Sequence, residues 1–294
     1  MTNVGVVNNQ NDNKFRNFTI GTVGAVAGYE AEPYIRVGLL YPVRKKIGSE
    51  IKTIQGGGFK PYIEKALKQN NLEKLNIIDL NASNAEAVKQ QLGITNERLD
   101  TKTKIIRHLM RISNKSASSF NRTLNGRNAF FSSKHNAVVC NFDKFGAPIF
   151  HEIGHKMNSQ SKNFIVKSLN KIRNPLAIFG TLGVSMTAML TKPKSERKNT
   201  KGIKNIDGFI KDNCGLIATG MMLPLTIEEI IASVKGDKIA KATELKGELL
   251  KKVQKAHKLS MISYIIGAIA TGTSVYLASK LRDLICAPPK RKTN

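Results

Sequence analysis

Residues 137–157 read AVVCNFDKFGAPIFHEIGHKM, and this stretch decides the fold. Its first part, Ala137–Phe142, is an apolar run with β-branched residues and predicts a strand. Its second part begins at Pro148, which suits the start of a helix, and predicts a helix that extends to about Met157. The stretch therefore predicts a strand that is followed directly by a helix.

The predicted helix carries His151-Glu152-Ile153-Gly154-His155, an HExxH motif. Positions i and i+4 lie on one face of a helix, so both imidazoles can reach one zinc ion. Glu152 lies next to them, where it can deprotonate the water that the metal activates. Gly154 costs about 1 kcal/mol relative to alanine in a helix. Its presence suggests that another element approaches closely at this position.

A zinc ion that leaves one position for water needs a third protein ligand. Residues 223–233 read LPLTIEEIIAS, and on a helix Glu229 and Ser233 head a face of small residues. That face could pack against the HExxH helix and present Glu229 to the metal. Glu228 lies on a different face, and an acidic first turn of a helix would also explain both glutamates. The choice between the two stays open, and the other downstream candidates are Glu244, Glu248 and His257.

The rest of the N-terminal half predicts helices and one hairpin. Asn128–Ser132 and Ala137–Phe142 predict two strands joined by a polar turn. The second of them, just before the HExxH helix, is expected to be an edge strand that binds an extended peptide. The predicted helices are Pro61–Gln69, Ala82–Leu92 and Thr103–Ile112. The expected fold class is therefore mainly α with a small β-hairpin or sheet.

Three uncharged runs follow the HExxH helix. Residues 175–191 and 259–279 contain 17 and 21 residues without a charge, enough to cross a hydrocarbon layer. Residues 214–227 form a 14-residue run, which is short for a span and suits a buried or half-inserted segment. About two to three membrane-associated helices are expected, with buried core helices as the alternative. Basic residues flank these runs on both sides, so the orientation stays open.

The composition bears on the partners. Lys and Arg number 47 against 21 Asp and Glu, a net charge of +26, which is typical of proteins that bind nucleic acid or an anionic membrane. Aromatic residues make up 6% and Trp is absent, so base-stacking platforms would be few. No nucleic-acid partner is expected, and the charge is interpreted as contact with membrane lipid. Three cysteines without a C-x-x-C pair exclude a disulfide framework.

HEIGH followed by Glu229-x-x-Ala232-Ser233 resembles the gluzincin metallopeptidases. Within them it is most similar to the integral-membrane group of the CAAX and heat-shock membrane proteases, over about residues 128–240. The resemblance implies a zincin-like core, a single zinc ion held by His151, His155 and Glu229, and Glu152 as the general base. The sequence departs from the group at Ser233, where Asp is usual. Ser233 is therefore a candidate for the surroundings of the ligands.

The leading hypothesis is a membrane-bound zinc-dependent endopeptidase that hydrolyses peptide or protein substrates. We expect an integral protein of a bacterial inner membrane or its equivalent. The alternative is a non-catalytic, basic membrane-associated protein with a structural or degenerate zinc site. His257 and Tyr264 are possible stabilisers of the oxyanion, although each suits a structural role as well.

The expected domain organisation follows the same boundaries. Residues 1–58 form a polar tail and a weakly apolar segment, with cleavage of that segment left open, and residues 59–127 form a helical region. Residues 128–258 form the metallopeptidase core, interrupted by membrane segments 175–191 and 214–227. Residues 259–294 form a transmembrane helix and a basic C-terminal tail.

Overall fold

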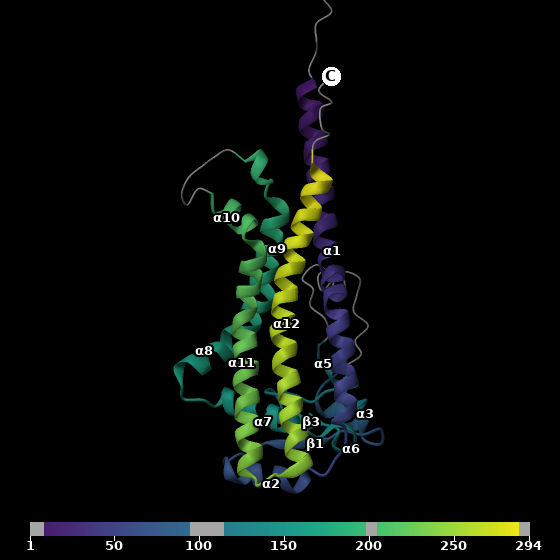
Figure 1. Cartoon of the computed structure of the whole chain (residues 1–294), viewed down its shortest axis with the longest axis vertical. Helices are drawn as coiled ribbons and strands as arrows, with labels where there is room; N and C mark the ends of the chain where they lie inside the picture. Colours follow the sequence, from purple (N-terminus) through teal and green to yellow (C-terminus); the bar gives the residue numbers. More distant parts are fainter. Residues whose placement is uncertain (1–8, 95–114, 198–204, 288–294) are drawn as a thin grey trace, which may run out of the picture. The chain divides into compact units, whose positions relative to one another are not determined.

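The computed structural model describes residues 9–94, 115–197 and 205–287 (Figure 1). The chain is mainly helical with one small sheet, which confirms the predicted class. Residues 1–58, expected to form a polar tail and a weakly apolar segment, contain the long helix α1 (Asn9–Thr53). The helix predicted at 103–112 lies outside the described residues. The elements are α1 (Asn9–Thr53), α2 (Lys60–Gln69), β1 (Asn76–Asp79), α3 (Ala85–Gln91), α5 (Lys115–Leu124), β2 (Phe130–Ser132), β3 (Ala137–Cys140), α6 (Phe142–Phe145), α7 (Ile149–Ser159), α8 (Phe164–Pro175), the π-helix η1 (Leu176–Gly180), α9 (Thr181–Leu190), the 3₁₀-helix η2 (Lys194–Glu196), α10 (Ile206–Asp212), α11 (Cys214–Ala242) and α12 (Gly247–Cys286).

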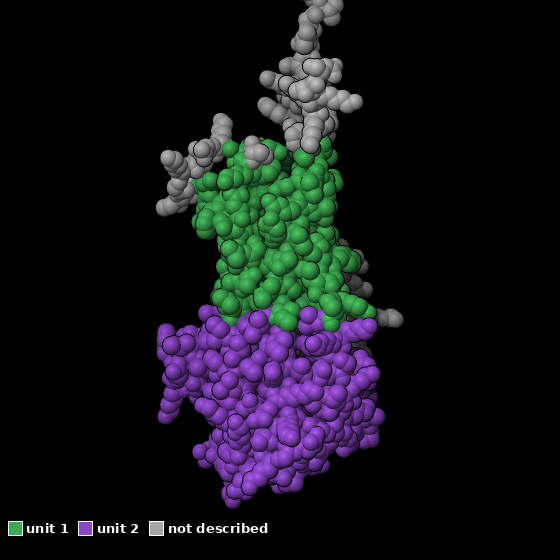
Figure 2. All heavy atoms as spheres, viewed as in Figure 1, with its two compact units in different colours: residues 1–42, 174–223, 266–294 green, residues 43–173, 224–265 purple. Residues whose placement is uncertain are grey.

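The chain divides into two compact units (Figure 2). Unit 1 comprises residues 1–42, 174–223 and 266–294, and unit 2 comprises residues 43–173 and 224–265. Each unit is discontinuous, because the long helices α1, α11 and α12 contribute to both. The HExxH motif and the downstream glutamates all belong to unit 2.

The sheet of unit 2 has the strand order β1-β3-β2. β3 pairs antiparallel with β2, as the predicted hairpin requires, and parallel with β1. Every residue of β3 is buried, which explains its uninterrupted apolar sequence. The prediction that this strand is an edge strand is therefore wrong: β3 is the centre of the sheet. β1, which the sequence analysis did not predict, and β2 form the edges.

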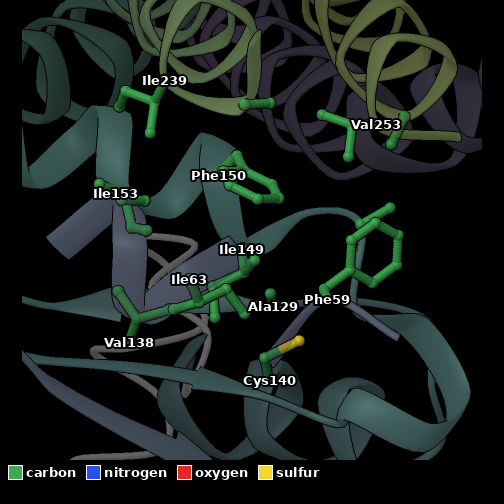
Figure 3. Packing of buried hydrophobic residues seen from close by; sticks show 14 of the residues in the cluster. Phe59, Ile63, Ala129, Val138, Cys140, Ile149, Phe150, Ile153, Ile239 and Val253 are labelled. Carbon is green, nitrogen blue, oxygen red and sulfur yellow. The ribbon is translucent and has the colours of Figure 1, made fainter. Parts of the chain in front are cut away.

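The core of unit 2 lies between the sheet and the helices that cover it. α7 contributes Ile149, Phe150 and Ile153, none of which is exposed to solvent (Figure 3). The Phe150 ring meets Phe59 edge to face, with ring centroids 6.3 Å apart. The opposite side of α7 is polar and also buried, so its side chains must find partners inside the protein.

Small residues allow α11 to approach α7 closely. A side chain at Gly154 would place its Cβ 2.3 Å from the Ala232 carbonyl oxygen. A side chain at Gly236 would place its Cβ 2.8 Å from the Phe150 carbonyl oxygen. The face of small residues on α11 thus packs against the HExxH helix, as predicted.

Unit 1 packs through small residues and exposes large apolar ones. A Cβ at Gly272 would lie 2.3 Å from the Gly215 carbonyl oxygen, and one at Gly28 would lie 2.8 Å from the Ala278 carbonyl oxygen. Close backbone approach of this kind is typical of helix pairs in membranes. The exposed large apolar residues of this unit include Phe179, Met186, Leu190, Leu216, Ile269 and Tyr276.

Two described helices, α11 and α12, are long and apolar enough to cross a bilayer by length and composition. They contain the uncharged runs 214–227 and 259–279. The third run, 175–191, spans the end of α8, the π-helix η1 and α9. In unit 1, Val184 and Ala188 of α9 share a buried apolar cluster with Ala218 of α11.

Candidate metal centre

Three side chains of unit 2 bring ligand atoms together. His151 and His155 are one turn apart on α7, and Glu229 comes from α11. The Nε2 atoms of the two histidines are 3.0 Å apart. The Glu229 Oε2 atom lies 3.1 Å from Nε2 of His151 and 3.3 Å from Nε2 of His155. All three residues are buried.

This triangle has the dimensions of a zinc site. Zinc bonds of about 2.0–2.2 Å in tetrahedral geometry separate the donor atoms by about 3.3–3.6 Å. The three observed separations fall within a few tenths of an ångström of that range. Two imidazoles and one carboxylate are also a ligand set that hydrolytic zinc enzymes use, with a fourth position left for water. The residues present could therefore hold one metal ion, and their spacing is compatible with zinc.

The other ring nitrogens of both histidines are already engaged. His151 Nδ1 lies 3.0 Å from Ser233 Oγ, and His155 Nδ1 lies 2.9 Å from Glu228 Oε1. Partners on the far nitrogen fix the tautomer and the orientation of a metal-binding imidazole. Both rings are thus held with Nε2 toward the ligand triangle. The adjacent glutamates take different positions, Glu229 in the triangle and Glu228 behind it.

Glu228 is fully buried and is the centre of a hydrogen-bonded network that the sequence analysis missed. Asn158 donates to its carboxylate at 2.9 Å, and Arg173 forms an ion pair with it. Asn158 follows His155 by three residues on α7, so helical spacing could have found it. The Arg173 contact left no such signal, because 55 residues separate the partners.

Glu152 lies beside the triangle on α7. The Phe131 backbone amide of β2 donates a hydrogen bond to its carboxylate. Burial raises the pKa of the Glu152 carboxyl, while the nearby His155 and His151 act in the opposite direction. Burial alone would lower the pKa of His155, but Glu229 and the charge of Glu152 outweigh it and leave that pKa raised. Glu152 is therefore a buried carboxyl group beside the triangle, and it holds a proton more tightly than a carboxyl in water does.

The remaining sequence candidates lie outside the triangle. Glu244 and Glu248 are exposed, and Glu244 forms an ion pair with Lys65 at 2.9 Å. The His257 ring centroid lies 5.9 Å from that of His151, and its Nδ1 contacts Asp237 at 2.7 Å. The Nε2 atom of His257 is buried and has no hydrogen-bond partner in the described part of the chain. The Tyr264 side chain interacts with Glu229.

Replacing Glu228 by glutamine is expected to weaken zinc binding by about 10- to 100-fold, the usual effect of changing a partner of a metal-bound histidine. The amide keeps the size of the side chain but loses the charge that pairs with Arg173 and His155. The measurement is a zinc titration against a competing chelator. An affinity equal to that of the wild type would remove Glu228 from the support of the site.

Comparisons with models of known protein families, with curated proteins and with solved structures found no match to this chain.

Proposed function

We propose that this chain is a membrane-bound zinc-dependent endopeptidase. One observation carries the proposal: the buried triangle of two imidazole nitrogens and one carboxylate oxygen, with Glu152 beside it. The far nitrogens of both histidines have partners, so Nε2 is left for the metal in each ring. Three ligands with the Glu152 carboxylate beside them suit hydrolysis better than structural zinc binding, because in a structural site protein ligands occupy all four coordination positions of the metal.

A zinc ion here would polarise the scissile carbonyl and lower the pKa of a water molecule to about 7. Glu152 would accept the proton of the attacking water and pass it to the leaving amine. The raised pKa of its carboxyl suits both steps, because proton transfer is most efficient when the pKa lies near the working pH. His151, His155 and Glu229 would hold the metal.

The edge strand β2 is the proposed place for the substrate backbone. The Phe131 amide of β2 donates to the Glu152 carboxylate, so this edge strand runs beside the proposed base. Residues whose backbone groups point outward at a sheet edge can pair with an extended peptide. A peptide added to β2 would bring its carbonyl groups past Glu152, a role that the sequence analysis assigned to the strand now found at the centre.

Attachment to a membrane is supported by the exposure of the apolar helices. Of the apolar 18-residue stretch of α11, only 28% is buried in the protein, and of the corresponding stretch of α12 only 39% is buried. A core helix of a soluble protein buries most of its apolar surface, because exposure to water costs about 25 cal/mol per Å². Lipid would cover this surface, and the close glycine contacts of unit 1 agree with that environment.

The test is the zinc content of the full chain purified in detergent, together with its cleavage of an unstructured protein. We expect one zinc per chain, cleavage that a chelator stops, and recovery when zinc is added back. A chain without stoichiometric zinc would contradict the proposal. Bound zinc without any cleavage would favour the alternative, a structural or degenerate site.

A further inference from the structure

Helix α8 differs from the other helices of this size in unit 2, because none of its residues is buried. Asn163 caps its start by accepting hydrogen bonds from the amides of Ile165 and Val166 at 2.9 and 3.2 Å. The helix is thus well formed at its beginning but adds nothing to the core.

Part of the exposed face of α8 is apolar. Phe164, Ile165 and Ile172 are 81%, 66% and 42% exposed, and Phe164 is the most exposed large hydrophobic residue in the described part of the chain. Ile165 and Ile172 are seven residues apart, about two helical turns, so they share one side. These three residues form what we call the α8 strip. Three exposed apolar side chains on a helix that adds nothing to the core form a candidate interaction surface.

Lysines border the strip. Lys167 and Lys171 of α8 and the preceding Lys162 are exposed, and none of them forms an ion pair among the described residues. Residues 153–195 contain seven Lys and Arg and no Asp or Glu. An exposed apolar strip beside unpaired lysines is the pattern of helices that lie in the interface of an anionic bilayer.

A neighbouring face of α8 reaches the metal centre. Arg173 lies nine residues after Phe164, about two and a half turns, and therefore points away from that side chain. Its guanidinium pairs with Glu228 and comes within 3.8 Å of Glu229 Oε1. Ile165 and Ile172 lie about a quarter turn from Arg173, so the same helix carries the α8 strip on one face and, on a neighbouring face, a contact to the carboxylates of the ligand network.

We propose that the α8 strip binds the surface of an anionic phospholipid bilayer and that this contact holds Arg173 at the metal centre. Arg173 is then a positioning residue, which fixes Glu228 and through it His155. The inference rests on the membrane attachment in the proposed function, but it does not depend on hydrolysis. It adds a regulator, anionic lipid, whose binding surface lies on α8.

The experiment places a fluorescent probe on the strip of the full chain. Cys286→Ser leaves Cys140 and Cys214, which are buried, and Ile165→Cys then supplies one accessible thiol. The labelled chain is reconstituted in nanodiscs whose acyl chains carry a bromine quencher. One set contains phosphatidylcholine alone, and the other also contains phosphatidylglycerol. A probe at Lys134→Cys, an exposed position in the turn between β2 and β3, is the matched control.

We expect the probe at position 165 to be quenched more strongly than the one at 134, and most strongly with phosphatidylglycerol. The excess should disappear in 1 M salt, where the screening length falls to about 3 Å. Equal quenching at the two positions would overturn the proposal, as would equal quenching in both lipids. A probe that responds only to added protein substrate would assign the strip to a protein partner and overturn it too.

The link to the metal centre is tested by replacing Ile165 and Ile172 with glutamine. The double variant should keep its zinc and its helical content but lose the dependence of zinc affinity on phosphatidylglycerol that the wild type shows. A wild type whose zinc affinity is the same in both lipids would contradict the link to Arg173. Zinc content and quenching are read without any cleavage assay, so a failed peptidase proposal remains distinguishable from a failed lipid proposal.

Discussion

Replacing Glu152 by glutamine is expected to slow peptide hydrolysis by about 10²- to 10⁴-fold and to leave one zinc bound per chain. Glutamine has the size of glutamate but cannot accept the proton of the attacking water. The amide oxygen can still receive the hydrogen bond from the Phe131 amide. Zinc should stay, because Glu152 lies outside the triangle of ligand atoms.

The same change should not unfold the chain. Burial disfavours the charged form of Glu152 and raises the pKa of its carboxyl, so the neutral amide suits this environment. We expect the midpoint of thermal unfolding to be equal to or above that of the wild type. Glu248→Gln, at an exposed position of α12, is the matched control and should retain full activity. An unchanged cleavage rate in Glu152→Gln would remove this residue as the general base.

The part of the site that lies within single helices could be predicted, because it depends only on helical periodicity. Spacing of four residues places His151 and His155 on one face, and the same rule places Glu229 and Ser233 together. Gly154 gave the one long-range hint, since a glycine inside a helix indicates close packing. Its partner proved to be Ala232, within the Glu229-x-x-Ala232-Ser233 motif.

What could not be predicted depends on contacts between distant segments. A four-residue strand such as β1 is defined by its pairing with β3, and Asn76–Asp79 has no pattern that separates it from a loop. Without β1, the sequence leaves β3 at an edge. The different roles of Glu228 and Glu229 have the same origin, because both are acidic residues near one end of an apolar run. Only the packing of α11 on α7 decides which carboxylate enters the ligand triangle and which one lies behind it.

The two adjacent glutamates therefore give the sharpest test of the metal centre. Replacing Glu229 by glutamine removes the negative charge that two imidazoles share and leaves only an amide oxygen, which binds zinc more weakly than a carboxylate does. We expect zinc affinity to fall by more than about 100-fold, since changes to the partners of ligands alone cost about 10- to 100-fold. Glu228→Gln, the same substitution one residue away, should stay within that smaller range.

Thermal unfolding provides a second measurement of the same contrast. A metal that binds only the folded chain stabilises it by about 2.7 kcal/mol when its free concentration is 100 times the Kd. At a fixed zinc concentration, the unfolding temperature of the wild type should rise, that of Glu228→Gln should rise less, and that of Glu229→Gln should not change. The reverse order of the two variants would assign the ligand role to Glu228. Equal shifts in all three proteins would contradict a site built on His151, His155 and Glu229, because loss of a direct ligand must weaken binding more than loss of a residue behind it.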